Sequence, residues 1–288
     1  MIFLFNLFYQ FGDALSFLLL AAIGLAVIFG MMKIINLAHG EFITIGAYGT
    51  VVSAKILNLP LPLAMMTGVL VTVIFGYVLE RIIIRHLYGR PLDSVVATWG
   101  ISLIVSQSFL VLFGPSFEGL KTPLSNFQLG EYSYSQYRLL LIFISILILV
   151  LLYVFFLKSN FGTLARATIE NPKIAATLGV KVDKVYMVTF CIGSALAGLT
   201  GAIYAPTMTI VPSIGQAFIV SAFVTVVTAG ASPFIGLIPA ASFLSLIQTT
   251  VTFYYHATIG ILALLFSVIL IIRFLPNGFS GLLIKLKK

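Results

Sequence analysis

The sequence predicts an all-α fold, a polytopic transmembrane helical bundle with about nine hydrophobic segments arranged as two inverted-repeat halves. Three observations support this class. Of the 288 residues, 60% are hydrophobic and only 8% are charged, and the mean hydropathy is +1.16. The apolar residues form long runs, and the basic residues lie in short segments between them. Globular soluble domains carry far more charge, so membrane insertion explains the composition best.

The hydrophobic segments are recognised by length, because a helix needs about 20 apolar residues to cross the hydrocarbon core. The second and seventh are short, and the sequence leaves open whether they cross the membrane completely. The nine segments are 11–32, 42–57, 61–84, 95–113, 138–157, 185–205, 214–229, 235–255 and 258–274.

We expect residues 1–288 to form a single transmembrane domain, with halves at about 11–113 and 185–274 around a central span. Residues 158–184 then form a cytoplasmic segment. If 80–93, 158–184 and 276–288 are cytoplasmic, they and their edges, with Lys33, carry 13 of the 16 basic residues. Basic residues favour the cytoplasmic side, so the chain is predicted to start outside and end inside.

A weak internal repeat relates two of the segments. Residues 40–52 align without a gap on 215–227, and Glu41 then coincides with Gln216. The predicted orientation gives the copies opposite directions, as an inverted repeat requires, and such repeats place a transport path at their interface. Chance similarity between two apolar runs is the alternative.

The most polar group beside a span consists of Asn36, His39 and Glu41. Charged groups within a bilayer normally face a cavity or a partner, so these residues are candidates for a polar lining. Alternatively they form a surface turn, in which Asn36 or His39 caps the next helix. A helical stripe in the fourth segment offers a second lining: Trp99, Ser102 and Ser106. Trp99 as an interfacial anchor and the serines as helix–helix contacts are the alternative.

The segment 158–184 contains a short helical pattern within an unusually polar stretch. Asn171 suits a helix cap, Pro172 suits the first turn, and Gly179 ends the pattern. A small helix at the membrane surface is a good contact for another protein. A basic loop that only sets topology is the alternative.

Several functions are excluded or disfavoured. Neither GxxxxGK[ST], HExxH nor GxSxG occurs, and the single Cys191 offers neither a disulfide framework nor a thiolate metal site. We therefore expect that the chain is not an enzyme, needs no cofactor or metal, and hydrolyses no nucleotide itself. The net charge is +8, but the basic residues are scattered over short loops, which is not typical of a nucleic-acid-binding surface.

Three motifs carry a family resemblance: INLAHGEF (35–42), RPLDSVVATWGIS (90–102) and the stretch 166–201 that begins RATIENPKIAATLG. They resemble the inner-membrane permeases of ATP-binding-cassette (ABC) importers for branched-chain amino acids and their relatives. The second motif, with residues 212–220, looks most like the branch that transports urea and short-chain amides. The resemblance extends from about residue 24 to 236.

The resemblance implies a bacterial inner-membrane permease that moves a small polar solute, with urea or a short-chain amide favoured. The alternatives are a branched-chain amino acid permease of the same family and a passive urea channel. It also implies three kinds of partner: a second, homologous permease, two cytoplasmic ATPase subunits and a periplasmic solute-binding protein. The expected solute pathway comprises Asn36, His39, Glu41, Trp99, Ser102 and Gln216. The expected ATPase-coupling residues are Arg166, Glu170, Asn171, Ala175, Ala176 and Gly179.

Overall fold

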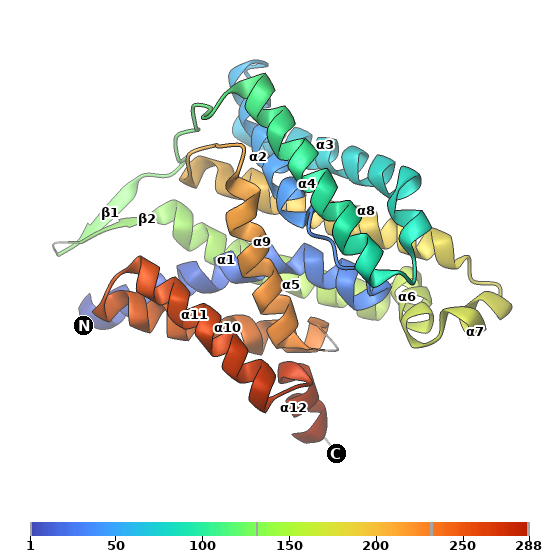
Figure 1. Cartoon of the computed structure of the whole chain (residues 1–288). Helices are drawn as coiled ribbons and strands as arrows, with labels where there is room; N and C mark the ends of the chain where they lie inside the picture. The colour runs from blue at the N-terminus through green and yellow to red at the C-terminus, as the bar shows by residue number, and fades with distance from the viewer. Residues whose placement is uncertain (1, 131, 231–232, 287–288) are drawn as a thin grey trace. The chain divides into compact units, whose positions relative to one another are not determined.

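A computed structural model describes residues 2–130, 132–230 and 233–286. Helices dominate it, with one small hairpin (Figure 1). In chain order the elements are α1 (Ile2–Met32), α2 (His39–Lys55), α3 (Leu61–Ile82), η1 (Ile84–Leu87), α4 (Pro91–Phe113), β1 (Asn126–Leu129), β2 (Tyr132–Ser135), α5 (Gln136–Lys158), α6 (Asn160–Glu170), α7 (Pro172–Thr177), α8 (Val182–Tyr204), η2 (Ala205–Thr207), α9 (Ile214–Ala229), α10 (Pro233–Tyr254), α11 (Ala257–Phe274) and α12 (Gly278–Leu286).

The polytopic helical class is confirmed, and each of the nine predicted hydrophobic segments lies in a helix, but not all nine helices are long enough to be candidate spans. Within the described residues, seven helices are long and apolar enough to cross a membrane. The two short segments form α2, with 17 residues, and α9, with 16. At about 1.5 Å per residue each covers roughly 25 Å, less than the ~30 Å hydrocarbon core. The predicted inverted repeat stays a prediction.

Three features were not predicted. α1 begins well before the first predicted segment and has 31 residues. The loop between the fourth and fifth segments contains the antiparallel hairpin of β1 and β2, in which Asn126 pairs with Ser135 and Leu129 with Tyr132. The polar segment 158–184 holds a second helix, α6, whose N-cap Ser159 accepts a hydrogen bond from the Gly162 amide at 2.9 Å.

The contacts divide the described chain into two compact units. Unit 1 comprises residues 1–22, 122–150 and 221–288, and unit 2 comprises 23–121 and 151–220. In unit 1, α10 packs against α11 and α12, and the Tyr9 hydroxyl donates to the Ser135 carbonyl at 3.3 Å, which ties β2 to α1. Arg138 forms an ion pair with Asp13.

The core of unit 2 is the mutual packing of α2, α3 and α8 (Figure 1). The Phe42 ring contacts Phe190 edge-on, with centroids 5.8 Å apart. Glycines let the backbones approach closely: a Cβ placed on Gly49 would lie 2.9 Å from Gly68 Cα, and one on Gly198 would lie 2.7 Å from the Thr72 side chain. α8 therefore packs through small residues, as membrane helices commonly do.

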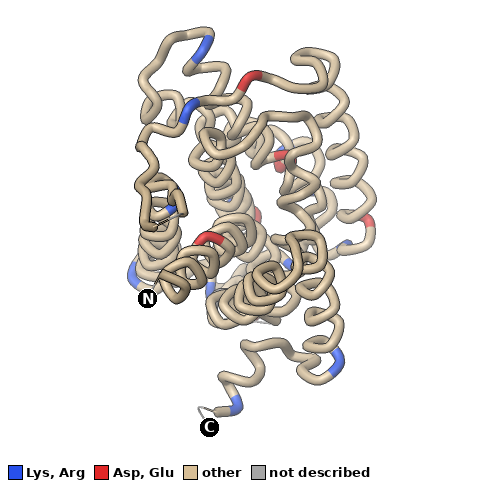
Figure 2. The backbone as a smooth tube through the Cα atoms, turned by 90° about the vertical axis from the view of Figure 1, so that its left-hand side faces the viewer, with Lys and Arg blue, Asp and Glu red and all other residues tan. Residues whose placement is uncertain are grey.

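Charged positions are sparse along the backbone, and most of the trace is uncharged (Figure 2). Two of the three basic residues that the orientation leaves outside are paired with an acid. Lys55 Nζ lies 2.6 Å from Glu118 Oε2 in unit 2, and Arg138 meets Asp13 in unit 1. Lys287 and Lys288, which the orientation counts as cytoplasmic, lie outside the described residues.

Candidate functional site: a buried polar turn and a cytoplasmic helix pair

The turn between α1 and α2 buries the predicted polar group. Lys33, with φ of 55°, takes the chain out of α1, and Asn36, His39 and Glu41 are at most 1% exposed. Asn36 Oδ1 accepts a hydrogen bond from the Ala38 amide at 3.0 Å, so Asn36 closes a turn before the helix. Ala38 is the N-cap of α2 and makes no side-chain cap bond. His39 is the first residue of the helix, not its cap.

Glu41 lies in the first turn of α2, where the helix dipole favours a negative charge. Its Oε1 accepts a hydrogen bond from Ser102 Oγ of α4 at 2.9 Å. Its Oε2 is buried without a hydrogen-bond partner, and so is the amide nitrogen Nδ2 of Asn36. A buried polar group without a partner is costly. The turn therefore offers one acceptor and one donor to a polar molecule that reaches it.

The other predicted pathway residues lie in different surroundings. Trp99 is 58% exposed and Gln216 is exposed, whereas Ser102 is half-buried and Ser106 is buried. The stripe along α4 shares a helical face, but its burial increases along the helix. The structure brings Ser102 to Glu41 and leaves Trp99 at the surface.

Two glycine pairs bring helix backbones into close contact within unit 2. A Cβ on Gly40 would collide with the backbone of Gly215, and one on Gly215 would collide with that of Gly40. These two residues also coincide in the 40–52 and 215–227 alignment. Likewise, a Cβ on Gly24 would lie 2.6 Å from the Gly193 carbonyl, and one on Gly193 would lie 2.9 Å from the Gly24 carbonyl. Both contacts are reciprocal, and both need glycine because a backbone cannot move aside.

The local pattern predicted for the polar segment is confirmed in α7. Asn171 Oδ1 accepts from the amides of Lys173 and Ile174 at 3.0 and 3.1 Å, and Pro172 occupies the first turn. Gly179, with φ of 88°, follows the helix end. This conformation is strained for other residues.

The exposure of α7 separates its two faces. Ala175 is 2% exposed, whereas Ile174 is 58% and Leu178 is 79% exposed. Ala176 and Gly179 are exposed as well. α7 rests on α6 and α8, so Ala175 serves this packing, and the apolar side chains of Ile174 and Leu178 form its free face.

α6 precedes α7 in the polar segment 158–184 and packs against it. Arg166 donates a hydrogen bond to the Phe156 carbonyl of α5, within unit 2, and a second to Thr163 Oγ1 at 3.2 Å. Glu170, the last residue of α6, is exposed. Arg166 therefore anchors the helix pair to the span that precedes it.

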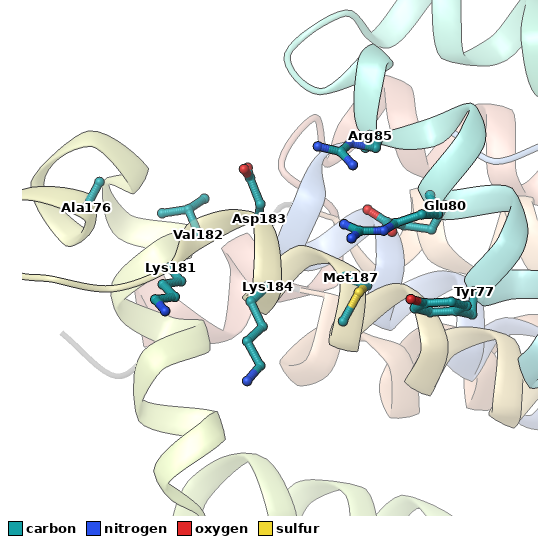
Figure 3. A pocket seen from close by; sticks show the side chains of 10 residues that line it. Tyr77, Glu80, Arg85, Ala176, Lys181, Val182, Asp183, Lys184 and Met187 are labelled. Atoms are coloured by element: carbon teal, nitrogen blue, oxygen red, sulfur yellow. The ribbon is translucent and has the colours of Figure 1, made fainter.

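A half-open cavity of about 660 Å³ lies next to α7 (Figure 3). Glu80, a carboxylate at the end of an apolar run, marks its place in the sequence, but no sequence pattern predicted a cavity there. The lining comes from α3, η1, α7, the α7–α8 turn and α8: Tyr77, Glu80, Arg81, Arg85, Ala176, Lys181, Val182, Asp183, Lys184 and Met187. Lys181 and Lys184 point away from Glu80 and Arg85 (Figure 3).

Glu80 is held from behind by Tyr88. The Tyr88 hydroxyl donates to Glu80 Oε1, and its ring contacts Tyr186 edge-on at 4.9 Å. Burial raises the pKa of the Tyr88 phenol, and its bond to the Glu80 carboxylate adds to that effect. Tyr88 is therefore a protonated donor at physiological pH, and it orients the carboxylate.

Comparison with known proteins gives a consistent family. The model of the family described as "Branched-chain amino acid transport system / permease component" matches residues 7–275. BraD, the high-affinity branched-chain amino acid transport system permease protein of Pseudomonas aeruginosa, is 30% identical over 238 residues, 77% of this chain and 76% of that protein. LivH of Escherichia coli K12, also a high-affinity branched-chain amino acid transport system permease protein, is 24% identical over 281 residues, 91% of this chain and 90% of that protein.

A protein of Methanocaldococcus jannaschii assigned as the branched-chain amino acid transport permease LivM is 28% identical over 211 residues, 68% of this chain and 58% of that protein. No solved structure matches the chain. None of these names points to urea or short-chain amides. The family consists of transport permeases, not enzymes, and its bacterial members are proteins of the inner membrane. The family match covers nearly the whole chain, so this multi-pass membrane protein belongs to the permease components of the branched-chain amino acid transport system.

Proposed function

We propose that the chain is a membrane-spanning permease subunit of an ABC importer, and that α7 transmits the ATPase cycle to it. The observation that carries this proposal is the exposed apolar face of α7, Ile174 and Leu178, within the most polar segment of the chain. Exposed apolar side chains outside the lipid-facing helices favour a protein partner. The expected partners are a second homologous permease, two cytoplasmic ATPases and a periplasmic binding protein. Relatives named LivH and LivM support the first of these.

The proposed solute is a branched-chain amino acid. The printed names of the relatives support this solute over urea, which the sequence favoured. Glu41 adds a chemical argument, because its buried Oε2 lacks a donor and the ammonium group of an amino acid would supply one. Urea or a short-chain amide is the second candidate, supported by the motif 90–102.

The proposed path passes the turn before α2. Asn36 and Glu41 contribute the unpartnered donor and acceptor, and Ser102 orients the carboxylate. The contact between Gly40 and Gly215 joins two residues that coincide in the repeat alignment, as a two-fold relation between the repeats would produce. It supports the inverted-repeat proposal, in which such a path lies near the repeat interface.

The proposed orientation has the N-terminus outside and α6, α7 and α12 in the cytoplasm. This orientation requires α2 and α9 to cross: α1 to α5 then make five crossings and place α6 and α7 inside, and α8 to α11 make four more and return the chain to the inside. Thirteen of the 16 basic residues then lie on the cytoplasmic side or at its edge, which supports the assignment.

Reconstitution tests the class and the solute together. The permease would be placed in liposomes with its neighbouring permease and ATPases, and with the binding protein outside the vesicles for import. We expect ATP-dependent uptake of labelled leucine and no uptake without ATP. Urea flux without ATP would instead indicate a passive channel. ATP-driven uptake of urea but not leucine would retain the class and reverse the solute.

A further inference from the structure

Charged residues of both signs line the cavity beside α7, and its four basic residues, Arg81, Arg85, Lys181 and Lys184, outnumber its two acids, Glu80 and Asp183. Glu80 and Arg81 come from the end of α3, Arg85 from η1 and Asp183 from the start of α8. Figure 3 shows Asp183 on one segment and Arg85 and Glu80 together on the neighbouring one. Among the described residues, ion pairs within 4.0 Å join Lys55 to Glu118, Arg90 to Asp93, and Arg138 to Asp13. None joins the two carboxylates of the cavity to its two guanidinium groups.

Glu80 is the most constrained of these groups. Its side chain is 3% exposed, Tyr88 occupies Oε1, and Oε2 is buried without a partner. An ionised carboxylate only accepts hydrogen bonds, so Oε2 requires a donor that the described part of the chain does not provide. A charged donor such as an ammonium group gives the strongest bond to it.

The other residues that line the cavity narrow the class of ligand that it can bind. Tyr77, Val182, Met187 and Ala176 give the cavity an apolar side, while Arg81 and Arg85 offer guanidinium donors suited to a carboxylate or phosphate. A simple cation would be opposed by the basic residues, and a simple anion, which those residues attract, would leave Glu80 Oε2 without a donor. A molecule carrying both an ammonium and an anionic group satisfies both sets. The volume of about 660 Å³ lies within the usual range for small-ligand sites.

We propose that this cavity binds a small zwitterion with a primary ammonium group, and that an α-amino acid with an apolar side chain is its ligand. The ammonium group donates to Glu80 Oε2, the carboxylate accepts from Arg81 and Arg85, and the side chain packs on Met187 and Tyr77. The same head-group chemistry occurs in ethanolamine phospholipids, which are the second possible source. The site is distinct from Glu41, because none of its lining residues belongs to the turn before α2.

The position of the site indicates a role in regulating transport, and this inference rests on the proposed function. Ala176 of α7 lines the cavity, so a bound ligand touches the proposed ATPase-coupling helix. On the proposed orientation the cavity opens to the cytoplasm, where imported solute is released. The fraction of sites occupied would then rise with the cytoplasmic amino acid concentration, and the bound ligand would contact α7.

The test measures binding, which does not depend on transport. Purified full-length permease, with its partner permease, is placed in phosphatidylcholine nanodiscs, and labelled leucine is titrated. Glu80→Gln and Arg85→Gln should each weaken one class of leucine site by about tenfold or more, since each removes a charge-assisted hydrogen bond. The control is Glu118→Gln, an acid-to-amide change at an exposed position away from the cavity, and it should leave binding unchanged.

Ligand analogues test the zwitterion itself. 3-Methylbutylamine, which lacks the carboxylate, and 4-methylpentanoate, which lacks the ammonium group, should each compete at least about tenfold less well than leucine. Equal binding of 4-methylpentanoate would mean an anion site and would overturn the proposal. Leucine binding that Glu41→Gln removes and Glu80→Gln spares would overturn it too, because the only site would then be on the solute path.

The lipid arm identifies the source of the ammonium group. Leucine binding that persists in phosphatidylethanolamine nanodiscs assigns the site to the free amino acid. If phosphatidylethanolamine abolishes the leucine binding that depends on Glu80, the lipid head group occupies the site. This result supports the shared ammonium chemistry. If wild type and Glu80→Gln are equally stable and bind leucine with the same affinity as each other in either lipid, the site is rejected. Failed uptake with intact Glu80-dependent binding would reject only the proposed function.

Discussion

Leu178→Ala is expected to weaken docking of the ATPase without destabilising the permease. The Leu178 side chain is 79% exposed, so most of its apolar surface is available to a partner. Truncation removes three carbons, at about 0.8 kcal/mol for each buried CH₂ group. If docking buries the exposed four-fifths, the loss is about 2 kcal/mol, or roughly 30-fold in affinity. The stability change should stay within about 0.5 kcal/mol, as at other surface positions.

The assay titrates the ATPase subunits onto nanodisc-embedded permease and measures affinity, with ATP-driven uptake as the second measurement. Ile174→Ala should act in the same direction and less strongly, because Ile174 is 58% exposed. Leu129→Ala is the matched control: it removes the same atoms from an exposed leucine of the hairpin, which is predicted to lie outside. It should leave ATPase affinity unchanged.

Ala175→Leu separates docking from folding of the segment. Ala175 is 2% exposed, so a larger side chain there must displace its neighbours, at a cost of typically 1–3 kcal/mol. This variant should lose thermal stability as well as coupling, whereas Leu178→Ala loses coupling alone. Unchanged ATPase affinity and uptake in Leu178→Ala would refute the docking argument for α7.

Three further predictions address the path, the packing and the topology. Glu41→Gln should retain more ATP-driven uptake than Glu41→Leu, because Gln still accepts from Ser102; equal uptake by both and by wild type would remove Glu41 from the path. Gly40→Ala should lower the thermal midpoint, at a typical cost of about 1–3 kcal/mol, since its Cβ meets a backbone. Gly100→Ala, with open space around it, is the control, and an equal loss in both would contradict the reasoning. Cysteines at Ser125 and Lys285, in a background without the native cysteine, should react with an impermeant reagent added outside and inside, respectively. The opposite pattern would invert the proposed orientation.

Local signals in the sequence were sufficient for several elements. The Asn171 cap, Pro172 in the first turn and Gly179 after the end of α7 could be predicted, because a cap and a positive φ involve residues within one turn of each other. The long apolar runs predicted the spanning helices for a similar reason, since length and hydrophobicity are properties of one segment. The hairpin was missed because its polar, aromatic strands resemble an ordinary loop in composition.

The candidate sites depend on contacts that sequence periodicity does not encode. Glu41 and Ser102 were both candidates, but only the packing of α2 against α4 brings them within 2.9 Å. Glu80 was not a candidate, because one carboxylate at the end of a span looks like a normal interfacial residue. Its burial and its bond to Tyr88 arise only when α3, η1 and α8 come together.

The sequence by itself determined the membrane class, the family motifs and the local form of α7. The tertiary structure decided which residues of that helix are free: Ala175 is buried and Leu178 exposed, although both belong to the same apolar pattern. The alignment of Gly40 with Gly215 shows the same division. Sequence similarity paired the two residues, but only the fold places their backbones in contact, because close approach depends on the path of both chains through space.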